Sequence, residues 1–383
     1  MYNIFQAKVM IKILLDPKIF NEQKFGGISR YYTEMWSQLN EIKGIQIDCP
    51  LFYTENIHYQ ESPLFANSFQ AKNSIFIKFS KIFRSYRPKK LKRKNTEKTI
   101  ELLKKQQFDL FIPTYYDPYF IDHLKDKPFV LTVYDMIHEL FPQYFRDDIV
   151  TVPNKKLLLE MATKIIAISN STKNDILVLY PHVDASKIEV VHLAHAIKPE
   201  LEIKLDLPQE YVLFIGNRGL YKNFTFFLKA LAPVLKQNAQ IHLLCAGGNP
   251  FTEEENQLIS ELNLEQQVIQ QNFQDVELAI YYKKALFFVF PSEYEGFGIP
   301  VLESMACGCP VILANHSSFP EVAGEAAVYF ELNNTADLTD KITLLLEDPK
   351  LRESYRLKGL EQAKKFNWKK TAMDCLNIYK KVL

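Results

Sequence analysis

The sequence predicts an α/β protein of two domains, each with a parallel β-sheet covered by helices on both faces. Apolar runs of strand length alternate with helical patterns along the chain, which is typical of parallel sheets. These runs fall into two sets, and 383 residues are too many for one ordinary core. The expected strands are 9–15, 45–49, 108–112, 129–133, 164–168, 188–192, 211–215, 241–245, 267–269, 286–290, 310–314 and 326–330.

The segment between the two sets of strands is expected to be the linker. Residues 196–208 carry Pro199 and Pro208 together with mixed charge. We therefore expect a first Rossmann-like domain over residues 1–200 and a second over residues 201–365. The last segment, 366–383, has the spacing of an amphipathic helix.

Composition excludes several classes of protein. Hydrophobic residues make up 47% of the chain and charged residues 24%, as in soluble globular proteins. The net charge of +1 implies no general attraction to nucleic acid. The five cysteines show neither metal-ligand spacing nor a disulfide framework, so we expect no metal site and a reducing compartment. No signal peptide or membrane-spanning run is expected.

The first expected strand is followed by a glycine pair at the start of a helix. Gly26 and Gly27 lie in the segment FGGISRY, residues 25–31. Ligands of open α/β sheets bind at such strand-to-helix turns, so the pair is a candidate ligand loop. Arg30 in the same helix either faces a substrate or is solvated.

A basic stretch departs from the mixed charge elsewhere. Residues 78–98 contain ten basic residues and one acidic residue, Glu97, and apolar residues recur at helical spacing from Ile75 to Tyr86. Residues 75–94 therefore suggest an amphipathic helix that contacts an anionic membrane surface. A helix packed on the core with a solvated basic face is the alternative. A nucleic-acid patch is a third reading, but no base-stacking module supports it, and we expect no nucleic-acid partner.

The strand expected at 164–168 leads into a polar segment. Ser171 or Thr172, followed by Asp175, has the spacing of a helix cap. We therefore interpret this segment as the start of a helix and not as part of a ligand site.

Two glycine-bearing turns follow the first strands of the second set. Gly216 begins a turn that carries Arg218 and Lys222, four residues apart. A diphosphate leaving group needs positive charge when no metal supplies it, and arginine offers paired donors to phosphate. Gly247, after the next strand, lets the backbone approach the same ligand. Ordinary surface cations on a solvated loop are the alternative.

The most informative segment is residues 291–303, PSEYEGFGIPVLE, which follows a buried apolar strand. Glu295 lies in the turn, and Glu303 lies one turn into the expected helix. Gly296 and Gly298 allow backbone N–H groups to approach a ligand, and the helix N-terminus favours an anion. Anion donors between two hydroxyl acceptors suit a sugar joined to a phosphate. The alternative is a pair of solvated carboxylates at a helix end.

This segment resembles the Glu-x7-Glu motif of the retaining family 4 glycosyltransferases, which have the GT-B fold. The resemblance continues through CGCP (307–310) and FPEVAG (319–324), and the segments FGGISRY and TVYDMIHELFP look like bacterial enzymes of O-antigen or capsule assembly. It implies two Rossmann-like domains facing a central cleft. It also implies that residues 366–383 cross back to the first domain.

The resemblance also implies roles for individual residues. Glu303 would bind the ribose hydroxyls of a nucleotide-sugar donor, and Glu295 with the backbone of Gly296, Phe297 and Gly298 would bind the donor sugar. Arg218 and Lys222 would stabilise the departing diphosphate without a metal or another cofactor. The glycines Gly26, Gly27, Gly216 and Gly247 would line the donor site.

One position departs from the family pattern. Many relatives have His-Asp where this chain has Tyr134-Asp135 after the strand expected at 129–133. Asp135 remains a candidate catalytic residue. His138, three residues after it, is a second candidate if the segment is helical, although a lone histidine is more often structural. Either Tyr134 or His138 could take the role of the family histidine.

Taken together, these features predict a retaining, metal-independent hexosyltransferase. The donor would be GDP-mannose or a UDP-sugar, and the acceptor a glycan or lipid-linked glycan of bacterial surface polysaccharide (O-antigen or capsule). We expect a cytoplasmic protein, peripheral on the inner membrane if residues 75–94 contact lipid. The alternative is a non-catalytic GT-B protein that binds sugar nucleotides or acts as a scaffold.

Overall fold

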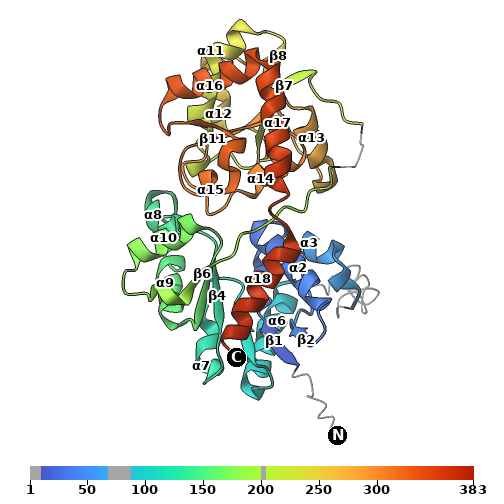
Figure 1. The fold of residues 1–383 in the computed structure, drawn as a ribbon, viewed down its shortest axis with the longest axis vertical. Helices are drawn as coiled ribbons and strands as arrows, with labels where there is room; N and C mark the ends of the chain where they lie inside the picture. Colours follow the sequence, from blue (N-terminus) through green and yellow to red (C-terminus); the bar gives the residue numbers. More distant parts are fainter. Residues whose placement is uncertain (1–9, 68–87, 200–203) are drawn as a thin grey trace, which may run out of the picture. The chain divides into compact units, whose positions relative to one another are not determined.

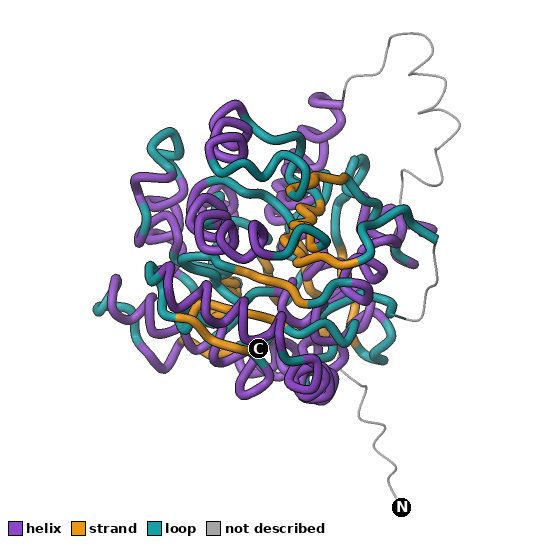
Figure 2. The backbone as a smooth tube through the Cα atoms, turned by 90° about the horizontal axis from the view of Figure 1, so that it is seen from above, coloured by secondary structure: helices purple, strands orange, loops and turns teal. Residues whose placement is uncertain are grey.

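The computed structural model describes residues 10–67, 88–199 and 204–383. The chain divides into two compact units. The first contains the residues up to Ile168 together with Thr172–Val191 and Trp368–Leu383, and the second contains Ser169–Ser171 and His192–Asn367. In each unit the strands lie between helices (Figure 1, Figure 2).

The first unit has two three-stranded parallel sheets. Their orders are β2-β1-β3 and β4-β5-β6, and an isolated bridge between Phe111 and Phe129 joins them. The strands are β1 (Ile11–Leu15), β2 (Ile45–Asp48), β3 (Leu110–Ile112), β4 (Val130–Val133), β5 (Lys164–Ala167) and β6 (Ile188–Val190). The helices are α1 (Lys18–Glu22), α2 (Gly27–Asn40), α3 (Ile57–Glu61), α6 (Pro88–Lys105), α7 (Ile121–Leu124), α8 (Ile137–Leu140), α9 (Thr151–Met161), α10 (Asn170–Leu179) and α18 (Trp368–Lys381). The first two residues of α10 belong to the second unit.

The second unit has one six-stranded parallel sheet of order β12-β11-β10-β7-β8-β9. The strands are β7 (Glu210–Ile215), β8 (Ile241–Ala246), β9 (Val268–Gln271), β10 (Phe287–Phe290), β11 (Val311–Ala314) and β12 (Val328–Phe330). The helices are α11 (Phe224–Gln237), α12 (Glu253–Glu261), α13 (Leu278–Lys284), α14 (Ile299–Ala306), α15 (Phe319–Ala323), α16 (Thr335–Glu347) and α17 (Pro349–Ala363). The strand order changes direction between β7 and β10, and open α/β sheets bind ligands at such a point.

The predicted fold class is confirmed. Each of the twelve expected strands is present, with ends that differ from the expectation by no more than two residues. The strands could be located in the sequence because their residues are buried on both faces of the sheet. Every residue of β10 (FFVF) and β11 (VILA) is buried, so these strands are continuous apolar runs in the sequence.

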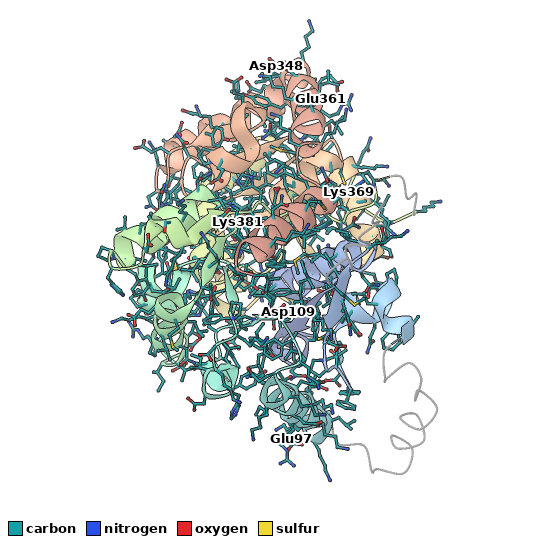
Figure 3. The ribbon with its side chains drawn as sticks, turned by 60° about the horizontal axis from the view of Figure 1, so that its bottom comes forward. Glu97, Asp109, Asp348, Glu361, Lys369 and Lys381 are labelled. Atoms are coloured by element: carbon teal, nitrogen blue, oxygen red, sulfur yellow. The ribbon has the colours of Figure 1, made fainter. Side chains whose placement is uncertain are left out.

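The last helix, α18, is part of the first unit and packs against α2. The Tyr31 hydroxyl lies 3.4 Å from Cys375 Sγ, and the Tyr379 hydroxyl donates to Met35 Sδ at 3.5 Å. At the end of α18, Lys381 pairs with Glu189 at 2.6 Å. Lys369 and Lys381 mark the two ends of this helix in Figure 3. Residues distant in sequence therefore complete the core of the first unit.

Part of the basic stretch lies outside the described residues. The apolar repeat from Ile75 to Tyr86, and with it most of the segment 75–94, is not described. The described part begins α6, where Lys89, Lys90, Arg93 and Lys94 are exposed. In the residues that the structure covers, none of the helices has the length and apolar character needed to cross a bilayer.

Candidate donor site and acceptor-side segment

The turn between β10 and α14 carries the two glutamates. Gly298 ends the turn at φ 93°, a left-handed conformation that a side chain disfavours, and a Cβ there would lie 3.2 Å from the Phe319 ring. Pro300 lies in the first turn of α14, where its missing N–H costs no hydrogen bond. Glu303 follows on the same helix and is 5% exposed.

Two serines fix the backbone of this turn. The Ser317 hydroxyl donates to the carbonyl of Glu295 at 2.6 Å. The Ser318 hydroxyl donates to the carbonyls of Glu295 and Phe297 at 2.9 and 3.0 Å. Both serines lie between β11 and α15, so the strand that neighbours β10 supports the turn. The sequence analysis missed them, because two serines in a loop carry no specific pattern.

The Glu295 carboxylate is paired with Lys222. The Lys222 ammonium lies 2.5 Å from Glu295 Oε1 and 5.1 Å from the centre of the Phe290 ring. Lys222 ends a short 3-10 helix (Leu220–Lys222) that follows β7, the strand next to β10. Burial lowers the pKa of Lys222, but the Glu295 charge and hydrogen bond outweigh it, so the pKa is raised. The ammonium therefore stays charged beside the glycine-bearing turn.

Arg218 is directed away from this pair. Its Nε donates to Glu255 at 3.0 Å, and its two terminal nitrogens donate to four successive carbonyls, those of Gly247, Gly248, Asn249 and Pro250, at 2.9–3.3 Å. The residue is 5% exposed. In this structure the guanidinium therefore fixes the loop after β8, and a direct contact with diphosphate would require it to exchange these partners.

The loops after β7 and β8 touch through their glycines. Gly216, Gly247 and Gly248 all have positive φ. A Cβ on Gly248 would lie 2.3 Å from the carbonyl oxygen of Gly216, so no side chain fits there. This contact brings Gly216 and Gly247 to one edge of the sheet.

Glu255 anchors Arg218 and was not predicted as a site residue. It forms a capping box with Thr252 at the start of α12, with Thr252 N–H donating to Glu255 Oε2 at 2.9 Å. Its other oxygen accepts from Arg218. The Thr-x-x-Glu spacing after a strand could have indicated the cap, but nothing in it indicates the arginine.

In the first unit, the expected glycine loop begins α2 at Gly27. A Cβ on Gly26 would lie 2.6 Å from Gln23 Oε1, which itself accepts from the backbone N–H of Ser29 at 3.0 Å. The loop is therefore packed against its own preceding turn.

The segment after β4 turns helical at Ile137, which places His138 in α8. His138 Nε2 lies 3.3 Å from Asp148 Oδ2, and its ring packs 4.2 Å from that of Phe145. Burial, followed by the nearby Lys155 charge, lowers the pKa of His138. Asp135 accepts the backbone N–H of Ile137 at 3.1 Å.

Tyr134 is a core residue. It is 5% exposed, and its hydroxyl donates to the carbonyl of Thr114 at 3.2 Å. Its backbone N–H donates to the hydroxyl of Tyr116 at 3.0 Å. The Tyr134 hydroxyl is therefore used inside the unit, whereas Nδ1 of His138 has no hydrogen-bond partner among the residues that the structure describes.

The expected cap at Ser171 or Thr172 is wrong. The helix begins at Asn170, so both residues lie inside its first turn. The Glu321 carboxylate accepts the N–H groups of Asn170 and Ser171 at 2.8–3.2 Å and lies 2.5 Å from His192 Nε2. Glu321 belongs to the segment 319–324, but no local pattern connects it to residues about 150 positions earlier.

In the described parts of the chain, no group of three or more His, Cys, Asp or Glu side chains is arranged to hold a metal ion.

Comparisons with known proteins define the class. The Glycosyltransferase Family 4 model matches residues 25–194, and the Glycosyl transferases group 1 model matches residues 198–362. The chain therefore belongs to the family 4 glycosyltransferases, the glycosyl transferases group 1, which have the GT-B fold.

Two curated relatives illustrate the similarity. O-antigen chain mannosyltransferase B of Escherichia coli is 29% identical over 282 residues, which cover 70% of this chain and 74% of that protein. N-acetylgalactosamine-N,N'-diacetylbacillosaminyl-diphospho-undecaprenol 4-alpha-N-acetylgalactosaminyltransferase of Campylobacter jejuni is 29% identical over 241 residues, which cover 61% of this chain and 65% of that protein.

A solved structure supports the fold. Anabaena HepE, in complex with UDP and glucose, superimposes with a TM-score of 0.66 at 15% identity, covering 97% of this chain and 99% of that chain. At this level of identity the likeness concerns the fold alone.

Proposed function

We propose that this glycosyltransferase transfers a hexose, with retention of configuration and without a metal, from a nucleotide-sugar to a glycan of bacterial surface polysaccharide. The observation that carries the proposal is the Lys222–Glu295 pair beside the glycine turn that begins α14. A fixed cation, a helix N-terminus and two carboxylates suit the phosphates and hydroxyls of a nucleotide-sugar.

In this proposal each residue has one task. Glu303 accepts hydrogen bonds from the ribose, and Glu295 with the turn at Gly296–Gly298 binds the donor sugar. Lys222 stabilises the charge that develops on the departing diphosphate, which is the step where a preorganised cation lowers the barrier. Arg218 contributes by fixing the loop after β8. Asp135 and His138 of the first unit are proposed to act on the acceptor side.

We propose a front-face course for the transfer. The acceptor hydroxyl oxygen forms its bond to the anomeric carbon on the face from which the diphosphate leaves. The bond from that carbon to the phosphate oxygen breaks, and the phosphate takes the hydroxyl proton. No covalent sugar–enzyme intermediate is needed, and configuration is retained.

The donor is proposed to be GDP-mannose or a UDP-sugar, and the acceptor a lipid-linked glycan. Support for the acceptor comes from the diphospho-undecaprenol in the name of the Campylobacter relative and from the O-antigen mannosyltransferase. The exposed lysines at the start of α6 favour a peripheral contact with an anionic membrane surface at the cytoplasmic face.

The first test is a thermal-shift screen with UDP, GDP, ADP and their common sugar conjugates in EDTA. A ligand at one hundred times its Kd stabilises the folded state by about 2.7 kcal/mol, so a selective upward shift of Tm is expected. The matching sugar conjugate is then incubated with lipid-linked acceptors, and the anomeric configuration of the product is determined by NMR. Binding without transfer to any acceptor would favour the non-catalytic alternative, and no binding would contradict the donor site.

A further inference from the structure

A buried lysine contacts residues 134–148 of the first unit, the segment proposed above to act on the acceptor side. Lys155, on α9, is fully buried, and its ammonium lies 2.9 Å from Glu139 Oε2 and 3.1 Å from the carbonyl oxygen of Asp135. It also lies 4.8 Å from the centre of the Tyr116 ring. Removing a lysine from water costs several kcal/mol, so its burial calls for specific partners.

The two groups that accept hydrogen bonds from Lys155 flank the start of a helix that is only one turn long. Asp135 precedes α8 and Glu139 lies inside it, four residues later. An isolated helical turn is unstable, because it fixes several dihedral angles for a single hydrogen bond. The ammonium bridges the carbonyl before the turn and a carboxylate within it. It therefore supplies one of the tertiary contacts that such a short helix needs.

Three residues on one face of α9 form hydrogen bonds to this part of the first unit. Thr151, Asn154 and Lys155 have the i, i+3, i+4 spacing of one helix face. The Thr151 hydroxyl donates to Asp148 at 2.6 Å, and Asp148 in turn lies 3.3 Å from His138 Nε2. The Asn154 amide donates to the carbonyl of Tyr116 at 3.1 Å.

We propose that Lys155 is the positioning residue that fixes Asp135 and His138 for the acceptor side of the transfer reaction. The assignment of this segment to transfer rests on the proposed function. The placement of the segment by Lys155 rests on the contacts alone. Lys155 does not itself touch the reacting atoms, because it is fully buried beneath the segment.

Burial of the ion pair decides which variants are useful. Lys155→Met leaves Glu139, whose side chain is 5% exposed, as an unpaired buried carboxylate, and this can prevent folding. The double variant Lys155→Met/Glu139→Gln removes both charges and keeps similar volumes. Lys155→Arg keeps the charge. Lys156→Met, at the exposed neighbouring position, is the matched control.

The first readout is independent of activity. Amide hydrogen exchange is measured over residues 134–148 by mass spectrometry. The double variant is expected to exchange at least about tenfold faster in this segment, while β5 and the second unit remain unchanged. Lys156→Met is expected to match the wild type. Unchanged exchange in the double variant would overturn the proposal.

The second readout separates positioning from simple stabilisation. Titration of His138 by NMR is expected to give a higher pKa in Lys155→Met, because a nearby positive charge is lost, and little change in Lys155→Arg. Charged and titratable groups near His138 are Asp135, Glu139, Asp148 and Lys155. If Lys155→Met does not fold, hydrogen exchange in the double variant decides, because that variant removes one charge of each sign near His138 and predicts no direction for its pKa. An unchanged His138 pKa in folded Lys155→Met would contradict the role of the Lys155 charge at this segment.

The third readout is transfer itself. The double variant is expected to lose at least about tenfold in kcat/KM for the acceptor while nucleotide-sugar affinity stays within about twofold, and Lys155→Arg is expected to restore part of the loss. Equal loss of donor affinity, or no loss at all, would overturn the positioning role. If the wild type transfers no sugar, the proposed function fails, and exchange and titration still decide whether Lys155 fixes the segment.

Discussion

The two units use buried charge in different ways. In the second unit, Lys222 and Glu295 form a partly exposed pair beside a glycine turn. In the first unit, Lys155 and Glu139 form a fully enclosed pair whose task is to hold a short helix. The comparison teaches that an ion pair at a strand end is not by itself a binding site. In the functions proposed above, the partly exposed pair binds a ligand and the enclosed pair positions a segment.

Arg218 gives the largest expected effect, because it forms a buried ion pair with Glu255 in the second unit. Arg218→Met leaves Glu255 and several loop carbonyls without their donor. We expect the free energy of unfolding to fall by about 3–5 kcal/mol, measured by urea denaturation. Arg356→Met, which removes an exposed pair with Glu353, should cost less than about 1 kcal/mol. A small loss for Arg218→Met would mean that the guanidinium is free to bind diphosphate instead.

Lys222 tests the role of the partly exposed pair that it forms with Glu295. Lys222→Ala should lower kcat by a factor of about 10²–10³, because one preorganised charge at the leaving group is lost. Lys229→Ala, at an exposed position on α11, should leave kcat unchanged. Steady-state transfer rates and a folded circular dichroism spectrum are the measurements. A kcat of Lys222→Ala equal to that of the wild type would mean that the Lys222–Glu295 pair has only a structural role.

Glu303, on the helix after the turn that carries Glu295, tests the second carboxylate of the same segment. Glu303→Gln keeps the shape but weakens hydrogen bonds to ribose hydroxyls, and we expect the Kd for the nucleotide to rise by about tenfold. Isothermal titration of the variant and the wild type with the nucleotide selected in the screen measures this ratio. An equal Kd in both proteins would remove Glu303 from the donor site.

Asp16 concerns a single buried carboxyl group in the first unit and tests stability instead of binding. Burial raises its pKa to about 6, although Tyr119 donates a hydrogen bond to it. Its contribution to stability is complete below about pH 4 and is lost as the pH rises through about 6, because the unfolded chain ionises first. Asp16→Asn should therefore be more stable than the wild type at pH 8, by about 1–3 kcal/mol.

The control for Asp16 is Asp122→Asn at an exposed position. Thermal denaturation of both variants from pH 4 to pH 8 gives the difference from the wild type at each pH. The difference for Asp16→Asn should grow between pH 4 and pH 6, and that for Asp122→Asn should stay flat. A flat difference for both would contradict the raised pKa.

The fold was predictable from the sequence because burial on both faces leaves a local pattern. Strands such as β10 and β11 contain only apolar residues, and their turns carry glycine and proline. The turn before α14 was predictable from a local pattern as well, since Glu295, Gly298, Pro300 and Glu303 lie within nine positions. The pairing of Lys222 with Glu295 was not predictable from local patterns, because 73 residues separate them.

The contacts of Lys155 and Arg218 were harder to predict. Lys155 lies in a run of two lysines on a helix, and nothing in the sequence distinguishes it from the exposed Lys156. Arg218 was placed at the diphosphate because arginine after a strand is typical of phosphate sites, yet four loop carbonyls use its donors here. Tertiary hydrogen bonds, which have no sequence period, decide both cases.

The packing of α18 against α2 has a consequence for how the chain matures. A ribosome makes residues 368–381 only after it has made all of the second unit, so the first unit waits for its last helix while the second already has every strand. During synthesis, Tyr31 and Met35 on α2 lack the partners that α18 later supplies. The unit that is translated first is therefore the one that completes its fold last, and cellular chaperones would meet it with that apolar face uncovered.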